Sequence, residues 1–176
     1  MKMKSKSMIT AALFTCMTAI AAFIKIPFPV VPVTLQVMVV IMAGLILNPR
    51  TAALSQIAYI IIGLTGIPVF TEGGGIHYIF SPTFGYLIGY IPGAWITAKI
   101  LSAGEKKNYF FAALTGVFLI YAIGATLLFL NLNFVAKNSI SILNTAKIGI
   151  LPFIVPDIIK VIAAAAISKK IIARQK

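Results

Sequence analysis

The sequence predicts an all-α integral membrane protein, with six transmembrane helices in one compact bundle. Of its 176 residues, 60% are hydrophobic and 10% are charged, whereas about a quarter of a soluble domain is charged. The apolar residues gather in six long segments, at 8–26, 33–47, 51–66, 82–101, 109–131 and 148–168. No linker rich in serine or in charge divides the chain, so we expect residues 1–176 to form a single membrane domain.

The six segments differ in how well they suit a membrane span. Segment 8–26 follows a basic start, as a signal peptide does, but five more apolar segments follow it, so we interpret it as the first transmembrane helix. Segments 33–47 and 51–66 fall short of the ~20 residues that a span needs, so we expect them to be shallow, bent or packed inside the bundle. The last three segments are long enough to cross a bilayer.

The charges indicate the orientation of the bundle. The chain carries 15 basic and three acidic residues, a net charge of +12. Only Lys25, Lys137 and Lys147 fall in the predicted outer segments, and Lys160 falls inside a span. Eleven basic residues share the other side: Lys2, Lys4, Lys6, Arg50, Lys99, Lys106, Lys107, Lys169, Lys170, Arg174 and Lys176. By the positive-inside rule both termini are cytoplasmic, and basic membrane flanks explain the charge without a nucleic-acid partner.

Two predicted outer loops are unusually apolar. Loop 27–32 has three prolines in six residues, which stiffen it into an extended path, and loop 67–81 contains three consecutive glycines. Surface loops are normally polar, and non-helical backbone at membrane depth is tolerated where it lines a cavity. We therefore expect these loops to cap a pocket. The alternative is that both loops rest in the lipid headgroup layer.

Asp157 and Lys160 lie in the apolar run 148–167. A charged side chain at this depth costs roughly 3 kcal/mol on insertion scales, so both should face a partner, a cavity or a ligand. Their i,i+3 spacing puts them on one helix face, and Lys160 leans toward the helix N-terminus and hence toward Asp157. We expect the pair to serve ligand recognition or a proton or ion relay. The alternative is an ion pair that only packs the bundle.

Few other side chains offer chemistry. His77 is the only histidine and Cys16 the only cysteine, so we expect no metal site. The sequence has no GxxxxGK[ST] phosphate loop and no visible nucleophile–base–orienter set, so we do not expect this chain to be an enzyme. Ala11, Thr15 and Ala19 recur every four residues and form a stripe of small side chains. Such a stripe suits close helix packing, either within this bundle or against another membrane protein.

Five stretches carry a family resemblance, in this order along the chain: AAFIKIPFPVVPVTLQ (21–36), AGLILNPR (43–50), YIIIGLTGIPVF (59–70), SPTFGYLIGY (81–90) and PDIIK (156–160). Together they resemble the BioY family, the biotin-specific S-components of energy-coupling factor (ECF) transporters. Residues 102–147 match little beyond hydrophobicity, and Ser81, Phe84 and Pro156 stand where the family pattern is richer in glycine.

The resemblance implies a multi-pass protein of a bacterial-type cell membrane that captures biotin from outside, in a pocket under loops 27–32 and 67–81. It implies assembly with a transmembrane T-component and two ABC-type ATPases, which would supply any ATP hydrolysis, and it implies no cofactor. The T-component would dock on Ala11, Thr15 and Ala19.

The resemblance also implies that Asp157 and Lys160 contact the vitamin. A carboxylate can accept a ureido N–H of biotin, and an ammonium can donate to the ureido carbonyl or to the valerate carboxylate. Our further candidates for the lining are Thr34, Gln36, Phe70 and Tyr86, and we expect the backbone around Gly74 to lie against the ligand as a lid. The rival hypothesis is a stand-alone secondary transporter in which Asp157 couples transport to protons. A structural subunit without a ligand is a third possibility.

Overall fold

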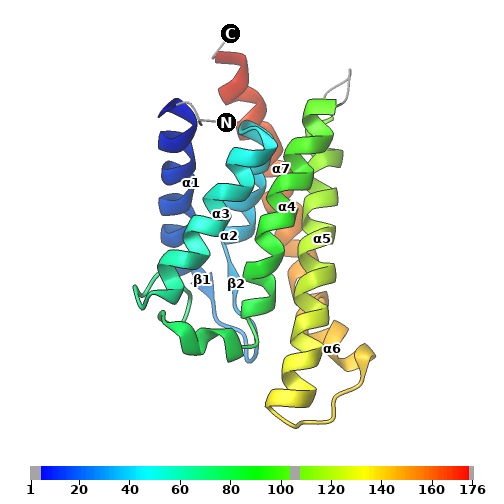
Figure 1. Cartoon of the computed structure of the whole chain (residues 1–176). Helices are drawn as coiled ribbons and strands as arrows, with labels where there is room; N and C mark the ends of the chain where they lie inside the picture. The colour runs from blue at the N-terminus through cyan, green and yellow to red at the C-terminus, as the bar shows by residue number, and fades with distance from the viewer. Residues whose placement is uncertain (1–4, 104–107, 175–176) are drawn as a thin grey trace.

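A computed structural model describes residues 5–103 and 108–174, which form a bundle of helices packed side by side (Figure 1). The bundle helices are α1 (Ser5–Phe23), α2 (Gln36–Ile46), α3 (Pro49–Leu64), α4 (Phe84–Ala103), α5 (Tyr109–Leu130) and α7 (Leu151–Arg174). The short elements are strands β1 (Lys25–Ile26) and β2 (Val33–Thr34), the 3₁₀ helix η1 (Ile76–Phe80), the π-helical turn η2 (Asn131–Val135) and α6 (Ile142–Gly149). The all-α fold class is confirmed.

The two ends of the bundle differ. The start of α1 and the end of α7 lie at one end, here called the terminal end, whereas β1, β2, η1 and α6 lie at the opposite loop end (Figure 1). Each predicted span overlaps one bundle helix, but residues 24–26 and 33–34 belong to an extended hairpin rather than to helices. A separate helix, α6, also precedes α7, which the sequence pattern did not indicate.

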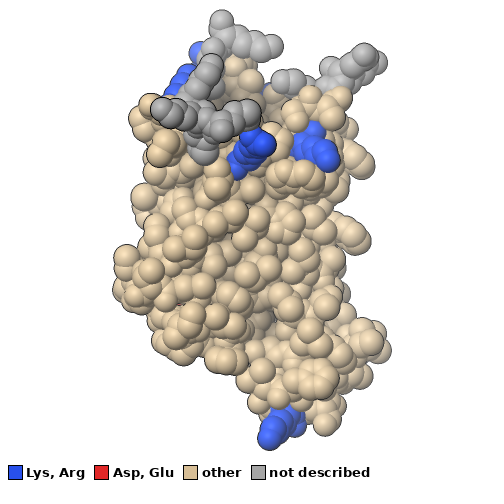
Figure 2. All heavy atoms as spheres, viewed as in Figure 1, with Lys and Arg blue, Asp and Glu red and all other residues tan. Residues whose placement is uncertain are grey.

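The middle of the bundle suits a bilayer. Within residues 5–103 and 108–174, three helical stretches are long and apolar enough to cross a membrane: Ser5–Phe23, Tyr109–Val135 and Ile142–Arg174. Figure 2 shows Lys and Arg side chains at the two ends of one face, with a broad uncharged band between them. Helix α2 has only 11 residues, and its Val40, Ile41 and Ala43 side chains are fully buried. This short helix is therefore enclosed by its neighbours, as its length predicts.

Asparagine side chains set where two helices begin. The Asn48 side chain accepts a hydrogen bond from the backbone N–H of Thr51 (3.0 Å), and Pro49 follows it at the first helical position of α3. The Asn108 side chain accepts from the backbone N–H of Phe111 in the same way (3.0 Å) at the start of α5. These caps satisfy backbone donors that a helix start leaves unpaired.

The two apolar loops, 27–32 and 67–81, are linked through Lys25. Strands β1 and β2 pair antiparallel, with Lys25 opposite Thr34, so residues 27–32 form the turn of a hairpin. The Lys25 ammonium donates to the backbone carbonyl of Thr71, which ties this hairpin to loop 67–81. Within that loop Gly73 and Gly75 adopt φ of 121° and 112°, a conformation that favours glycine.

The small-residue stripe of α1 packs inside the bundle. The Thr15 hydroxyl donates to the backbone carbonyl of Ser55 on α3 (2.8 Å), and both Thr15 and Ala11 are buried. Ala19 is partly buried and packs against the core. Ala11 and Thr15 are therefore not free to receive a partner in this conformation. The contact agrees with packing within the bundle, the alternative given for this stripe, and the sequence pattern alone did not show which side of α1 meets α3.

Close packing of α2 on α4 yields a prediction about stability. A Cβ atom at Gly44 would lie 2.6 Å from the Cβ of Thr97 and 2.7 Å from the Ala94 carbonyl oxygen. Because backbone blocks relaxation there, Gly44→Ala is expected to destabilise the fold by about 1–3 kcal/mol. A lower thermal unfolding midpoint of the detergent-solubilised protein would show this. The control is Ala122→Ser, which adds one atom at an exposed position of α5 and should leave the midpoint unchanged.

Candidate ligand-binding site

A buried ion pair lies in α7. The Lys160 ammonium donates to the Asp157 carboxylate at 2.6 Å, and the two residues are 9% and 2% exposed. Their i,i+3 spacing places both on one helix face, and Lys160 leans toward Asp157 as predicted. Each charge offsets part of the other's desolvation cost, which is several kcal/mol for an isolated buried ion.

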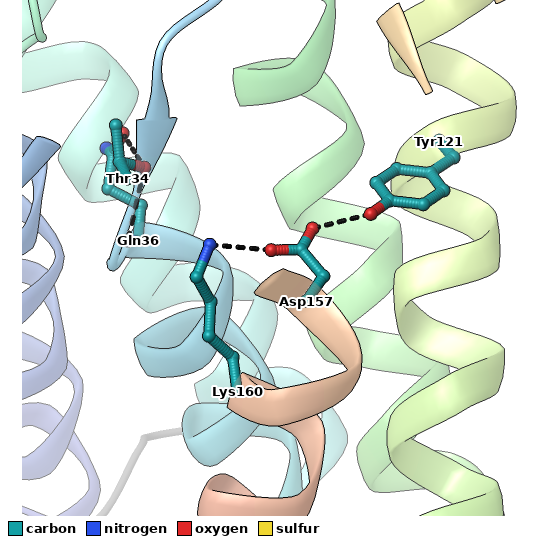
Figure 3. Close-up of polar contacts among 5 residues, drawn as sticks. All are labelled: Thr34, Gln36, Tyr121, Asp157 and Lys160. Carbon is teal, nitrogen blue, oxygen red and sulfur yellow. Dashed lines mark hydrogen bonds and ion pairs between the residues drawn. The ribbon is translucent and has the colours of Figure 1, made fainter. Parts of the chain in front are cut away.

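Tyr121 is a third member of this cluster. Its hydroxyl, from α5, donates to the second carboxylate oxygen of Asp157 at 2.7 Å. Figure 3 shows the Asp157 carboxylate between the Lys160 ammonium and the Tyr121 hydroxyl. Sequence reasoning missed this residue, because an isolated tyrosine in an apolar run carries no signal of its partner. Only the packing of α5 on α7 brings the hydroxyl to the carboxylate.

The cluster borders a cavity near the loop end. Its volume is about 40 Å³, which is room for about one water molecule. Polar and aromatic side chains form one part of the lining and apolar hairpin residues another. The lining residues are Val31, Pro32, Thr34, Val37, Tyr86, Tyr90, Tyr121, Phe153, Asp157 and Lys160. Residues from the hairpin and from four helices thus meet around one small space.

The structure brings four of the seven sequence-predicted site residues to this cavity: Thr34, Tyr86, Asp157 and Lys160. Gln36 lies just outside the lining. Its amide donates to the Tyr59 hydroxyl at 2.7 Å, and its carbonyl oxygen accepts from the Thr34 hydroxyl at 3.2 Å (Figure 3). Gln36 therefore fixes the position of the Thr34 side chain through this hydrogen bond.

Phe70 and Gly74 are not part of the cavity lining. The Phe70 ring packs between the rings of Tyr59 and Tyr78, at centroid distances of 5.4 and 4.5 Å, and is fully buried. Gly74 lies against the backbone of Ile67, where a Cβ would overlap the Ile67 carbonyl oxygen. Both residues shape loop 67–81 against α3. The sequence did not show that this loop folds back onto α3, the helix that precedes it.

Aromatic side chains of α4 and α7 complete the wall. The Tyr86 hydroxyl donates to the backbone carbonyl of Gly149 at 2.7 Å, and the Tyr86 ring lies 6.2 Å from the Phe153 ring. Tyr90 is buried one turn after Tyr86, a spacing that the sequence displays. Phe153 had no comparable signal, since phenylalanine is common throughout the apolar segments.

The arrangement suits a small ligand that carries both donors and acceptors on an apolar body. The Asp157 carboxylate is an acceptor, the Lys160 ammonium is a donor, and aromatic rings can cover flat apolar groups. Such a few polar groups on an apolar wall are typical of ligand pockets.

Similar proteins from several organisms carry almost the same description. Two similar chains, both described as probable biotin transporter BioY, come from Lysinibacillus sphaericus (40% identity; 94% of this chain and 86% of the relative) and from Pyrococcus horikoshii (41%; 96% and 98%). A biotin transporter BioY of Thermotoga maritima is 32% identical over 94% of this chain and 95% of its own length.

A solved structure agrees with these relatives. The fold matches a crystal structure of the S-component for biotin from an ECF-type ABC transporter, with a TM-score of 0.83 and 26% identity. The match covers 99% of this chain and 96% of the other. The BioY family model matches residues 1–176, so this chain belongs to the BioY family.

Proposed function

We propose that this protein is the biotin-binding S-component of an ECF transporter, and that it captures biotin in the cavity beside Asp157 and Lys160. The observation that carries the proposal is the buried ion pair at a cavity under the loop-end hairpin, in a chain of the BioY family. The names of the relatives and of the matching structure supply biotin as the ligand.

Recognition follows from the chemistry of the lining. Asp157 accepts a ureido N–H of biotin, and Lys160 donates to the ureido carbonyl or to the valerate carboxylate. The rings of Tyr86, Tyr90 and Phe153 cover the apolar parts of the ligand.

Residues next to the lining support those contacts. Thr34 faces the cavity, and its hydrogen bond to Gln36 fixes its rotamer. Phe70 and Gly74 act indirectly by holding loop 67–81, to which the hairpin is tied through Lys25.

Binding requires the cavity to enlarge. Pockets for small organic ligands usually occupy about 300–1,000 Å³, whereas this cavity has about 40 Å³. Val31 and Pro32 of the hairpin turn form part of the lining, so outward movement of residues 27–32 gives the ligand both an entrance and room. The hairpin thus acts as the cap that its proline content suggests.

Delivery to the cytoplasm depends on partners in this proposal, namely a T-component and two ABC-type ATPases in the plasma membrane. The T-component docks on the lipid-facing side of α1, where Ala12, Cys16 and Ile20 are exposed next to an apolar groove between α1 and α2. Lys6, Arg50, Lys99 and the basic residues of late α7 belong to helix ends at the terminal end, which supports a cytoplasmic location of both termini.

Asp157→Asn tests the carboxylate. Loss of the Asp157 charge leaves Lys160 uncompensated and replaces the charged ureido acceptor with a weaker neutral one, so biotin affinity should fall at least about thirtyfold. Titration calorimetry on the purified protein measures the change. Glu72→Gln is the matched control, since it makes the same chemical change at an exposed loop residue. Parent-like affinity in Asp157→Asn would remove Asp157 from the site.

Tyr121→Phe tests the third member of the cluster. The substitution removes only the hydroxyl that holds the Asp157 carboxylate, and a hydrogen bond to a charged group contributes about 1.5–3 kcal/mol. Biotin affinity should therefore fall by at least about tenfold. Tyr109→Phe, at the terminal-end start of the same helix, should bind as the parent does. Equal affinities in the two variants would contradict a role for the Tyr121 hydroxyl.

Reconstitution separates this proposal from a proton-coupled transporter. Vesicles that contain only this chain should bind biotin but should not accumulate it in their interior. Vesicles that also contain the T-component and the ATPases should accumulate biotin when ATP is present on the side of the membrane that the ATPases face. Uptake by the chain alone that an uncoupler abolishes would instead favour Asp157 as a proton-coupling carboxylate.

A further inference from the structure

The side chain of Tyr86 lies in a slot formed by two glycines from other elements. Gly124 comes from the middle of α5, and Gly149 is the last residue of α6. A Cβ atom at Gly124 would overlap ring atoms Cγ, Cδ1 and Cε1 of Tyr86. A Cβ atom at Gly149 would lie 2.5 Å from the Tyr86 hydroxyl oxygen. Neither position can therefore carry a residue larger than glycine unless the Tyr86 ring moves.

The two positions press on different parts of Tyr86. At Gly149 the obstacle on the tyrosine is the hydroxyl alone, because the ring atom Cζ would be 3.8 Å from the added Cβ, an ordinary contact distance. The other close neighbour there, Cδ2 of Leu128 at 2.6 Å, is the free end of a flexible side chain. At Gly124 the obstacle is the ring itself. This difference makes the slot testable.

The slot also determines what Tyr86 presents to the cavity. The hydroxyl is engaged by the Gly149 carbonyl at 2.7 Å, so the ring rather than the hydroxyl remains for an apolar part of a ligand. Tyr86 lines the cavity, whereas neither Gly124 nor Gly149 is among the lining residues. A methyl group added at either glycine would displace Tyr86 and would therefore change the part of the cavity wall that Tyr86 forms.

We propose that Gly124 and Gly149 are positioning residues of the binding site, which set the wall of the cavity by seating Tyr86. This inference rests on the proposed function only in taking biotin as the ligand. Through Gly149 it also gives α6 a role, since the end of this short helix holds the hydroxyl of a cavity residue.

The experiment compares Gly149→Ala, Tyr86→Phe and the double variant, by biotin titration calorimetry and by thermal unfolding. Gly149→Ala should weaken biotin binding by about tenfold or more, as expected for overpacking that moves a cavity wall. Tyr86→Phe removes the hydroxyl obstacle, so the double variant should bind within about threefold of Tyr86→Phe alone. The substitution that rescues is thus one that by itself removes a hydrogen bond.

Two further variants sharpen the result. Gly124→Ala should weaken binding with either tyrosine or phenylalanine at position 86, because its obstacle is the ring. Gly44→Ala is the matched packing control: its Cβ would lie 2.6 Å from the Cβ of Thr97, and neither residue lines the cavity, so it should change stability but not affinity.

Parent-like binding by Gly149→Ala would overturn the proposal, and so would a loss of binding that Tyr86→Phe does not rescue. If the parent itself fails to bind biotin, the proposed function fails instead. The slot is then judged by thermal unfolding alone: Tyr86→Phe should restore the midpoint lost in Gly149→Ala, and absence of that rescue would refute the slot.

Discussion

The candidate site depends on the ion pair between Asp157 and Lys160, because the desolvation cost of either charge in apolar surroundings is high without the other. Their 2.6 Å contact and the hydroxyl of Tyr121 satisfy the carboxylate on both oxygens. This arrangement constrains the helices: α5 must present Tyr121 to α7, and the hairpin must close above the pair. Buried ion pairs are weak sources of stability. The proposed contact with biotin gives this pair, at the edge of a cavity, a role other than stability.

Glycine allows the surrounding helices to build that cavity. Gly85, Gly89 and Gly93 bring α4 against α5 so closely that side chains at these positions would meet α5 atoms at 2.5–3.0 Å. Close contact of helices through small residues is the usual solution in a membrane, where lipid gives little hydrophobic drive for association. The same contact delivers Tyr86 into its slot. The helix packing therefore also forms the candidate site, because the wall of the cavity is part of the helix interface.

Much of this organisation could be predicted from local sequence signals. Asp157 and Lys160 stand out because charge is costly in an apolar run, and their common helix face follows from their spacing. Thr34 follows a proline-rich loop and reaches the cavity, whereas Phe70 and Gly74 serve the packing of their own loop. Ala11 and Thr15 showed the right pattern for close packing but not its partner, which is α3. Each of these differences concerns which surface meets which, and not the kind of residue involved.

The sequence by itself determined that this is a helical membrane protein, that two of its loops are unusually apolar, and that a charged pair lies within an apolar run. These properties depend on composition, on helical periodicity and on the cost of burying charge, all of which are local. Only the tertiary structure decided that Tyr121 completes the pair, that Phe153 and Tyr86 form its wall, and that Gly149 receives the Tyr86 hydroxyl. Those contacts join residues up to 67 positions apart, as for Tyr86 and Phe153, and no local pattern encodes which helices will face each other.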